Sequence, residues 1–382
     1  MSLEITPVRG SRDLETFIRL PESLYRDDRT FVPMLRMSER RMLDAARNPF
    51  YLHAEAEHFL ARRDGRPVGR VSAIRNLRHE EFHPDDKVGF FGYFDSGDDP
   101  ETAKALLGAA EVWVRARGLG KIRGPVNPST NDPCGTLIDG FKWAPFILMT
   151  GNPPYTPKLI EGAGYAKSKD LLAYFLLRTD VIHEKIRRVA AEVRSRGEVK
   201  LRPFELAHFE RELNLVMELY NDAWSRNWGF IPMTPEEIRF AADDLKSIVL
   251  PELAFFAFLG DRPVGFALAL PDINHALKKA RGRLLPFGWI YFLKPFLRKI
   301  PTFRILALGV RKEHQQLGIG TLFYERYMDV AKERGYVGAE LSWILEDNEL
   351  MNRPLRTMGA KAYKTYRLYE KTLDLSPDPR PS

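Results

Sequence analysis

One segment of this chain carries most of the information about its architecture: Val310-Arg-Lys-Glu-His-Gln315-Gln-Leu-Gly318-Ile-Gly320-Thr-Leu-Phe323. The apolar run from Ile305 to Val310 comes before it and predicts a short buried strand. After the two glycines, an amphipathic pattern predicts a helix over residues 321–334. A strand that passes through a glycine-bearing turn into a helix leaves backbone N–H groups unpaired at the helix N-terminus. The segment therefore predicts an anion site suited to a phosphate.

The composition sets the broad class of the protein. A chain of 382 residues is too long for one average hydrophobic core, so two domains of similar size are expected. The formal net charge of +7 is moderate and fits a phosphorylated cofactor or an anionic membrane surface. Cys134 is the single cysteine, so no intramolecular disulfide can form and a reducing cytosol is compatible.

The distribution of apolar residues predicts a cytoplasmic location, with peripheral attachment to the inner membrane as the alternative. The N-terminal sequence Met-Ser-Leu-Glu-Ile-Thr-Pro has no apolar signal region. No apolar stretch reaches the roughly 18 residues that a spanning helix needs. No histidine pair has the spacing of metal ligands, so we expect no metal.

Two pairs of similar sequence segments indicate that the chain contains an internal duplication. The hairpin sequences Arg63-Asp-Gly-Arg-Pro67-Val-Gly69 and Leu259-Gly-Asp-Arg-Pro263-Val-Gly265 are nearly the same, and Gly69 and Gly265 are 196 positions apart. The second pair of similar segments lies near the end of each half, around Gly164 and Gly359, which are 195 positions apart. Each half then has the same expected order: strand, helical region, hairpin, strand, helix, strand, helix and terminal strand.

This order and the opening segment resemble one known family. Gln315-x-x-Gly318-x-Gly320 after a strand that ends in valine is similar to the pyrophosphate-binding signature, Arg/Gln-x-x-Gly-x-Gly/Ala, of the GNAT superfamily of acyl-CoA N-acyltransferases. The resemblance implies an α/β protein with two tandem GNAT-like domains, each a mixed, mostly antiparallel sheet flanked by helices. We expect a first domain over 1–178, a connecting helix over 179–197, a second domain over 198–375 and a disordered tail over 376–382.

The resemblance also implies the donor and its contacts. Acetyl-CoA or a longer acyl-CoA would be the acyl donor, and the backbone N–H groups of Leu308 and Val310 would orient its thioester and pantetheine arm. The pyrophosphate would lie against Gln315, Gln316, Leu317, Gly318, Ile319, Gly320 and Thr321. In the first half, Asp98 and Asp99 stand at the corresponding helix start and would repel a pyrophosphate, so this half is predicted to have a degenerate cofactor site.

The acceptor side is defined less clearly by the sequence. In GNAT proteins an asparagine at the position of Asn348 often contacts pantetheine, whereas the usual tyrosine acid is replaced here by Leu355. Glu346 is the candidate base for an amine, and a solvated or helix-capping carboxylate is the alternative interpretation. Asn221, Trp224 and Trp228 fall in the segment that borders the acceptor pocket in the family, and core packing is the alternative for the tryptophans.

An insertion separates the second hairpin from the strand at 305–310. Residues 273–312 contain no acidic residue, and within residues 278–299 lysines and arginines flank a block rich in Leu, Phe, Trp and Tyr. This pattern suits a segment in an anionic membrane interface. A loop that packs internally is the alternative, and nucleic acid is not expected because the cations do not alternate with the aromatic residues.

The expected reaction is therefore attack of a primary amine on an acyl-CoA thioester. A two-copy GNAT protein with this insertion is similar to the bacterial ceramide-synthase type of N-acyltransferase, which implies a lipid or sphingoid amine as acceptor. Acetylation of a small soluble amine is one alternative, and aminoacyl transfer of the Fem type is another. The missing tyrosine also leaves a non-catalytic CoA-binding or scaffolding protein open.

Overall fold

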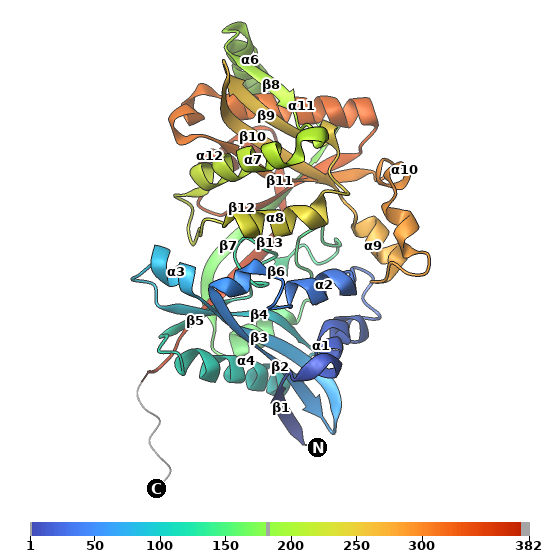
Figure 1. The fold of residues 1–382 in the computed structure, drawn as a ribbon, viewed down its shortest axis with the longest axis vertical. Helices are drawn as coiled ribbons and strands as arrows, with labels where there is room; N and C mark the ends of the chain where they lie inside the picture. Colours follow the sequence, from blue (N-terminus) through green and yellow to red (C-terminus); the bar gives the residue numbers. More distant parts are fainter. Residues whose placement is uncertain (1, 181–183, 376–382) are drawn as a thin grey trace. The chain divides into compact units, whose positions relative to one another are not determined.

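The computed structural model describes residues 2–180 and 184–375 (Figure 1). The chain divides into two compact units, the first made of Met1–Asp170 with Tyr366–Ser382 and the second of Leu171–Thr365. The predicted tail over 376–382 lies outside the described residues, as does 181–183 within the predicted connecting segment.

The first unit contains a mixed sheet whose strands follow the order β1-β2-β3-β4-β5-β13. Neighbouring strands are antiparallel except for β4 and β5, which are parallel. The strands are β1 (Leu3–Pro7), β2 (Ala54–Arg63), β3 (Arg66–Asn76), β4 (Val88–Ser96), β5 (Lys121–Gly124) and the C-terminal part of β13 (Lys361–Thr372), with a short β6 (Thr136–Asp139) beside them.

Helices cover both faces of this sheet. They are α1 (Gly10–Leu24), α2 (Arg36–Met42), α3 (Leu77–Phe82), α4 (Pro100–Arg115) and α5 (Thr156–Gly162), with a 3-10 helix η1 (Pro49–Leu52). The apolar positions of α4, such as Leu106, Ala110 and Val114, recur every three or four residues, so they form one stripe that packs on Phe91 of the sheet. A separate core around Phe17 of α1 lies against other strand residues.

The second unit repeats this pattern with the strand order β8-β9-β10-β11-β12-β7. Here β11 and β12 are the parallel neighbours, and the other pairs are antiparallel. The strands are β8 (Val199–Pro203), β9 (Ala254–Leu259), β10 (Arg262–Pro271), β11 (Thr302–Val310), β12 (Gly338–Leu345) and the C-terminal part of β7 (Ala166–Leu177). The predicted fold class, mixed and mostly antiparallel sheets flanked by helices, is confirmed.

The last strand of each sheet comes from the other half of the sequence. Leu171–Leu177 of β7 pairs with β12 in the second unit, whereas Tyr369–Thr372 of β13 pairs with β5 in the first. The compact units therefore differ from the predicted ranges 1–178 and 198–375. Those ranges describe the repeats along the chain and stay a prediction.

The helices of the second unit cover the two faces of its sheet, except for the short helices α9 and α10, which lie beside it (Figure 1). They are α6 (Glu184–Ser195), α7 (Phe209–Trp224), α8 (Pro235–Leu245), α9 (Asn274–Ala280), α10 (Lys294–Leu297), α11 (Ile319–Arg334) and α12 (Glu349–Thr357), with 3-10 helices η2 (Leu206–His208), η3 (Pro251–Leu253), η4 (Gly288–Phe292) and η5 (Lys312–Leu317). Phe323 and Tyr327 of α11 pack on Phe303 in the core of one face. Trp224 of α7 packs on Phe266 from the other face, with ring centroids 5.9 Å apart.

Candidate functional site

The two parallel strands of the second unit separate partway along their length. Thr302–Ile305 of β11 pairs with Gly338–Leu341 of β12, and the pairing ends there. The next residue, Leu306, has no partner in β10. Ala307 pairs with Leu268 and Ile305 pairs with Ala269, so β11 has one residue more than β10 at this point. Such a β-bulge bends a strand. We call the point of separation, at Ile305 and Leu341, the apex.

Beyond the apex, β11 is no longer paired with β12, and backbone N–H groups of β11 point toward the side where β12 would otherwise pair. The Arg311 N–H donates to the Val264 carbonyl of β10 at 2.8 Å, and the carbonyl of Val310 instead accepts from Gln315 Nε2 at 3.2 Å. Peptide groups alternate in direction along an antiparallel strand. The N–H groups of Val310 and Leu308 therefore point away from β10, which is the orientation that their predicted role requires.

The glycine-bearing turn leads into an uncapped helix. Gly318 adopts a left-handed conformation (φ 76°), and α11 begins at Ile319 with no side chain bonded to its first N–H groups. A Cβ at Gly318 would lie 2.7 Å from Val189 Cγ1, so only glycine fits there. A Cβ at Gly320 would meet nothing closer than Leu308 Cδ2, at 3.9 Å. The Thr321 N–H already donates to the carbonyl of Gly318 at 3.0 Å. The turn therefore offers a pyrophosphate the other N–H groups at the start of the helix, together with space.

Part of the positive charge beside this turn is already neutralised. Arg311 forms an ion pair with Glu218 and donates through Nε to the carbonyl of Pro263 at 2.9 Å. The Lys312 N–H donates to Asp222 at 3.3 Å. The side chain of Gln315 is bonded to Val310, so it fixes the turn to the end of β11. We therefore expect the backbone of residues 315–321, more than the basic side chains, to hold the pyrophosphate.

In the first unit, the helix that corresponds to α11 is α4. A carboxylate caps the start of α4, whereas no side chain caps the start of α11. Asp99 is the N-cap of α4, and its Oδ1 accepts from the Glu101 N–H at 3.1 Å. Arg63 donates to Asp99 Oδ2 at 2.8 Å, and a hydrogen bond from Thr102 lowers the pKa of Asp99. A charged carboxylate at this helix start opposes a second anion. The degenerate cofactor site of the first half stays a prediction.

Two of the residues predicted beside the cleft have local structural partners. Asn348 is the N-cap of α12, and its side chain accepts from the Met351 N–H at 3.3 Å. Glu346 lies in the turn after β12, and its carbonyl accepts from Asn352 at 3.2 Å. Leu355, at the position of the absent tyrosine, is fully buried in the core. The pantetheine and base roles of Asn348 and Glu346 stay predictions.

Sequence reasoning missed Asn352, which anchors the end of β12. Its side chain is fully buried, and Nδ2 donates to the carbonyl of Leu345 at 2.9 Å. Its Oδ1 accepts from the Tyr174 hydroxyl at 3.1 Å. The sequence does contain a sign of this role, because Asn352 lies on the apolar face of a short amphipathic helix.

The predicted acceptor-side residues lie on α7 and the loop after it. Trp224 stacks on Tyr220 with centroids 4.7 Å apart and fills the space in front of Gly309, where a Cβ would lie 2.4 Å from its ring. This position supports the packing interpretation of Trp224. Asn221 donates to the Met233 carbonyl at 3.4 Å, and its Oδ1 is buried without a hydrogen bond from the described residues. Substrate contacts by Asn221, Trp224 and Trp228 stay a prediction.

A buried polar cluster, also missed by sequence reasoning, lies at the apex on the face opposite α11. Glu340 and Lys364 are both fully buried, with Oε2 and Nζ 3.6 Å apart. Ser342 donates to Glu340 at 2.6 Å and accepts from Arg304 Nε at 2.9 Å, and the Tyr363 hydroxyl bonds to Glu340. Burial lowers the pKa of Lys364. Charged residues inside otherwise apolar strands were the available signal.

Comparison with known proteins agrees with this fold and site. Residues 213–359 match the model of the acetyltransferase (GNAT) family. The chain is 36% identical over 376 residues to "Bacterial ceramide synthase" of Caulobacter vibrioides (strain NA1000 / CB15N), covering 97% of this chain and 98% of that protein. It is also 36% identical over 370 residues to "Protein YghO" of Escherichia coli (strain K12), covering 95% and 94%.

The chain therefore belongs to the GNAT family, whose members use acyl-CoA donors, and it is an N-acyltransferase. A solved tandem GNAT protein from the clavulanic acid biosynthesis pathway has the same architecture, with a TM-score of 0.56 at 12% identity, over 99% of this chain and 100% of that one. At this identity the likeness concerns the fold alone. The tandem GNAT resemblance is confirmed.

Proposed function

We propose that the protein transfers an acyl group from acyl-CoA to a primary amine of a lipid-like acceptor at an anionic membrane surface. The observation that carries the donor assignment is the separation of β11 from β12 beside the uncapped N-terminus of α11. The turn at 315–321 would hold the pyrophosphate, and the N–H groups of Leu308 and Val310 would hold the pantetheine arm.

Distances along β11 fit this arrangement. From Val310 to the apex at Ile305 the strand advances five residues, or about 16 Å. The pantetheine arm is about as long as four to five extended residues, roughly 15 Å. A donor anchored at the turn would therefore place its thioester at the apex.

The chemistry then needs positioning and one proton transfer. The amine nitrogen attacks the thioester carbonyl carbon, a C–N bond forms, the C–S bond breaks, and CoA leaves as thiolate. The amine gives up one proton, and the thiolate takes one. Backbone N–H groups of β11 would stabilise the negative charge that develops on the carbonyl oxygen. Glu346 is the predicted base, and the Tyr363–Glu340–Ser342 chain offers a second proton acceptor at the apex.

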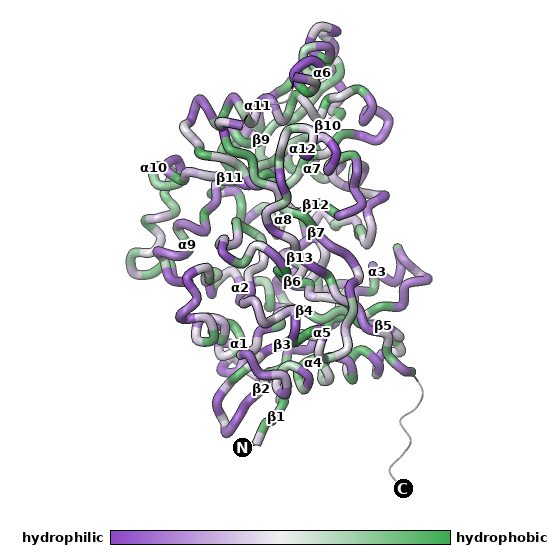
Figure 2. Tube along the Cα trace, turned by 180° about the vertical axis from the view of Figure 1, so that it is seen from behind, coloured by the Kyte–Doolittle hydropathy of each residue, from purple (hydrophilic) through white to green (hydrophobic). Residues whose placement is uncertain are grey.

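The insertion supports a membrane-borne acceptor. Leu285 and Phe287 are 77% and 71% exposed, and Trp289, Leu293 and Phe296 are exposed as well. The exposed cations around them are Lys278, Lys279, Arg281, Arg283, Arg298 and Lys299. Figure 2 shows hydrophobic and hydrophilic stretches side by side between α9 and α10. Such a surface suits an anionic interface. Across the described residues, no helix combines the length and the apolar character needed to cross a bilayer.

The acceptor assignment is tested by thiol release. The protein should release CoA from palmitoyl-CoA at least tenfold faster with a sphingoid base than with small amines such as spermidine or glucosamine. The relative named "Bacterial ceramide synthase" supports this choice of amine. A preference for acetyl-CoA with a small amine would favour the soluble-amine alternative. CoA binding without release to any amine would favour a scaffold.

Membrane attachment is tested by co-sedimentation with vesicles of phosphatidylglycerol and phosphatidylcholine. Changing Leu285 and Phe287 together to serine should reduce binding at least tenfold, because each buried side chain contributes about 1.5–3 kcal/mol. The matched control changes Leu52 and Val112, which are 81% and 60% exposed in the other unit, to serine. Added salt should weaken binding of the parent protein. Unchanged sedimentation of the Leu285→Ser/Phe287→Ser protein would refute the membrane surface.

A further inference from the structure

One buried side chain holds the turn that follows β12. β12 pairs with β11 as far as the apex, and its last two residues, Ile344 and Leu345, pair with β7 on the opposite side. Beyond Leu345 the backbone leaves the sheet and turns into α12. Asn352 of that helix is fully buried and donates through Nδ2 to two carbonyls of the turn, that of Leu345 at 2.9 Å and that of Glu346 at 3.2 Å.

The hydrogen bonds set the orientation of the Asn352 amide. The carbonyls of Leu345 and Glu346 can only accept, so the NH2 group faces them. The amide oxygen faces the other way and accepts from the hydroxyl of Tyr174 at 3.1 Å, and Tyr174 is itself buried on β7. Both polar atoms of the side chain thus have partners, which makes the amide a rigid link between α12, β7 and the end of β12.

This link fixes the backbone on both sides of Glu346. The carbonyl of Leu345 belongs to the peptide group that precedes the Glu346 Cα, and the carbonyl of Glu346 belongs to the peptide group that follows it. Each peptide group is planar, so its direction is set once its carbonyl is held. Because both groups are bound to the same amide, the course of the chain through the end of β12 is fixed.

The end of β12 is also the second wall of the expected pantetheine cleft. The apex pair is Ile305 and Leu341. Val310 on β11 and Glu346 after β12 each lie five residues beyond it. β10 pairs with β11 as far as Val310, so the first wall is held by strand pairing up to its end. The second wall is not paired with β11 beyond the apex, and Asn352 holds its end from α12.

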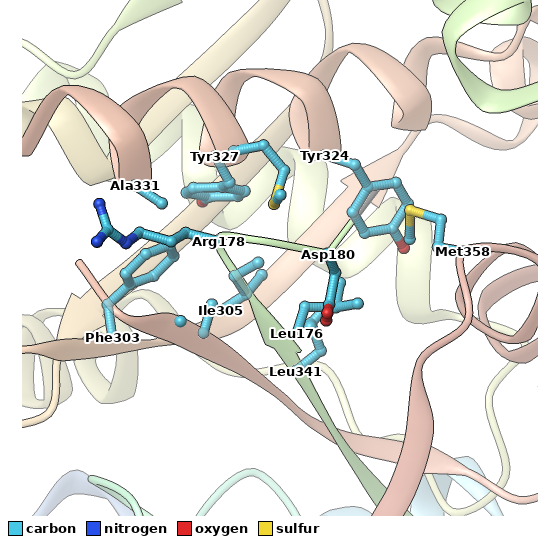
Figure 3. A pocket seen from close by; sticks show the side chains of 13 residues that line it. Leu176, Arg178, Asp180, Phe303, Ile305, Tyr324, Tyr327, Ala331, Leu341 and Met358 are labelled. Carbon is cyan, nitrogen blue, oxygen red and sulfur yellow. The ribbon is translucent and has the colours of Figure 1, made fainter. Parts of the chain in front are cut away.

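The side of α12 that carries Asn352 is fixed in the core of the second unit. Leu355 of α12 and Met358 directly after it pack in the same core as Tyr324 of α11, and Figure 3 shows Met358 beside Tyr324. Met351, which precedes Asn352, has its sulfur 3.9 Å from the Tyr324 hydroxyl. The helix is therefore a firm support for the end of β12.

We infer that Asn352 is a positioning residue for the acyl donor, because it sets the separation of the two walls of the pantetheine cleft. The inference rests on the proposed function. A cleft that is rigid before binding loses less conformational freedom when the donor enters. Without the Asn352 bonds, the peptide groups on both sides of Glu346 would move, and the pantetheine arm would bind against a mobile wall.

The first experiment separates the contribution of pantetheine from that of the pyrophosphate. Calorimetric titration with CoA and with 3′-phospho-ADP, which has the pyrophosphate and lacks pantetheine, gives two affinities, and their ratio measures what the pantetheine arm adds. Asn352→Leu keeps the approximate shape of the side chain and removes its hydrogen bonds. We expect this ratio to fall at least about tenfold, with the affinity for 3′-phospho-ADP kept within about twofold.

Two results would overturn the inference and leave the proposed function intact. One is an unchanged ratio in Asn352→Leu. The other is an equal loss of affinity for both ligands, which would mean a general structural role. A parent protein that binds neither ligand would instead overturn the proposed function.

The matched control is Tyr327→Phe. The Tyr327 hydroxyl donates to the buried carbonyl of Leu253 at 3.2 Å, and Tyr327 lies on α11 above the sheet (Figure 3). The variant removes a buried hydrogen bond away from the end of β12, so its ratio of affinities should equal that of the parent. If Asn352→Leu does not fold, Asn352→Ala decides, because a water molecule in the vacated space can satisfy the two carbonyls without tying them to α12. The same fall of the ratio is expected for Asn352→Ala.

Discussion

Replacing Gly320 by aspartate should abolish acyl-CoA binding and leave the protein as stable as before, or slightly more stable. Gly320 lies in the first turn of α11, where an added Cβ meets only Leu308 Cδ2, at 3.9 Å. A carboxylate in the first turn of a helix is favourable by about 0.3–1 kcal/mol. The same carboxylate takes the N–H groups that the pyrophosphate needs and repels its charge.

The expected loss of affinity is at least a hundredfold. Two unit charges about 4 Å apart near a protein surface repel by roughly 4 kcal/mol, before salt screening. Calorimetric titration with CoA measures the affinity, and thermal unfolding measures the stability. Gly318 is a poorer choice for this test, since its φ of 76° and the nearby Val189 make any side chain a backbone perturbation.

Gly108→Asp is the matched control for this prediction. It adds the same charge on α4 of the first unit, at a glycine where a Cβ meets nothing within 4 Å. Its CoA affinity should equal that of the parent. Unimpaired CoA binding by Gly320→Asp would mean that the turn at 315–321 is not the pyrophosphate site.

The fold could be predicted from the sequence because its signals are local. The glycine turn after 305–310 and the two hairpins at 63–69 and 259–265 each depend on residues that are neighbours in the chain. The structure forms both hairpins, as β2–β3 and β9–β10. The capping box at the start of α8 is equally local, since Thr234 and Glu237, three residues apart, exchange both hydrogen bonds.

The choice of strand partner could not be predicted in this way. The apolar pattern of β7 makes it a buried strand, but the same pattern suits pairing with β5 or with β12. Only the assembled sheets show that β7 completes the second unit and β13 the first. This exchange explains why the compact units do not follow the repeats.

Site chemistry that depends on pairing across strands was hidden for the same reason. Arg304 and Glu340 are 36 positions apart, and they meet because β11 and β12 pair in parallel with these two residues opposite each other. The family resemblance pointed to Asn348, which is the N-cap of α12 in the structure, and did not point to the buried Asn352 four residues later. A count along the chain cannot show which of two asparagines faces the core.

The second large effect is expected on stability, when the buried ion pair of Glu340 and Lys364 is broken. Glu340→Gln keeps the shape of the side chain and its bonding capacity to Ser342, but leaves the Lys364 charge without its carboxylate. Breaking a buried pair from one side costs about 3–5 kcal/mol of unfolding free energy. Chemical denaturation at pH 6 to 9 measures this loss.

The loss should depend on pH in a definite direction. Burial already lowers the pKa of Lys364, and the loss of Glu340 removes the largest effect that opposes this lowering. With a folded-state pKa below that of the unfolded chain, the unfolded state binds more protons between the two values, so stability rises with pH across that window. Glu340→Gln should therefore be least stable at the acidic end of the range.

Adding Lys364→Met to Glu340→Gln separates folding from catalysis. The double variant removes one charge of each sign, so it should recover most of the lost stability and lose the added pH dependence. If Glu340 accepts the amine proton through its contacts with Ser342 and Tyr363, CoA release stays low in the stable double variant. If the rate of CoA release recovers fully together with the stability, Glu340 has only a structural role. Glu346 is then the candidate base, and Glu346→Gln tests it.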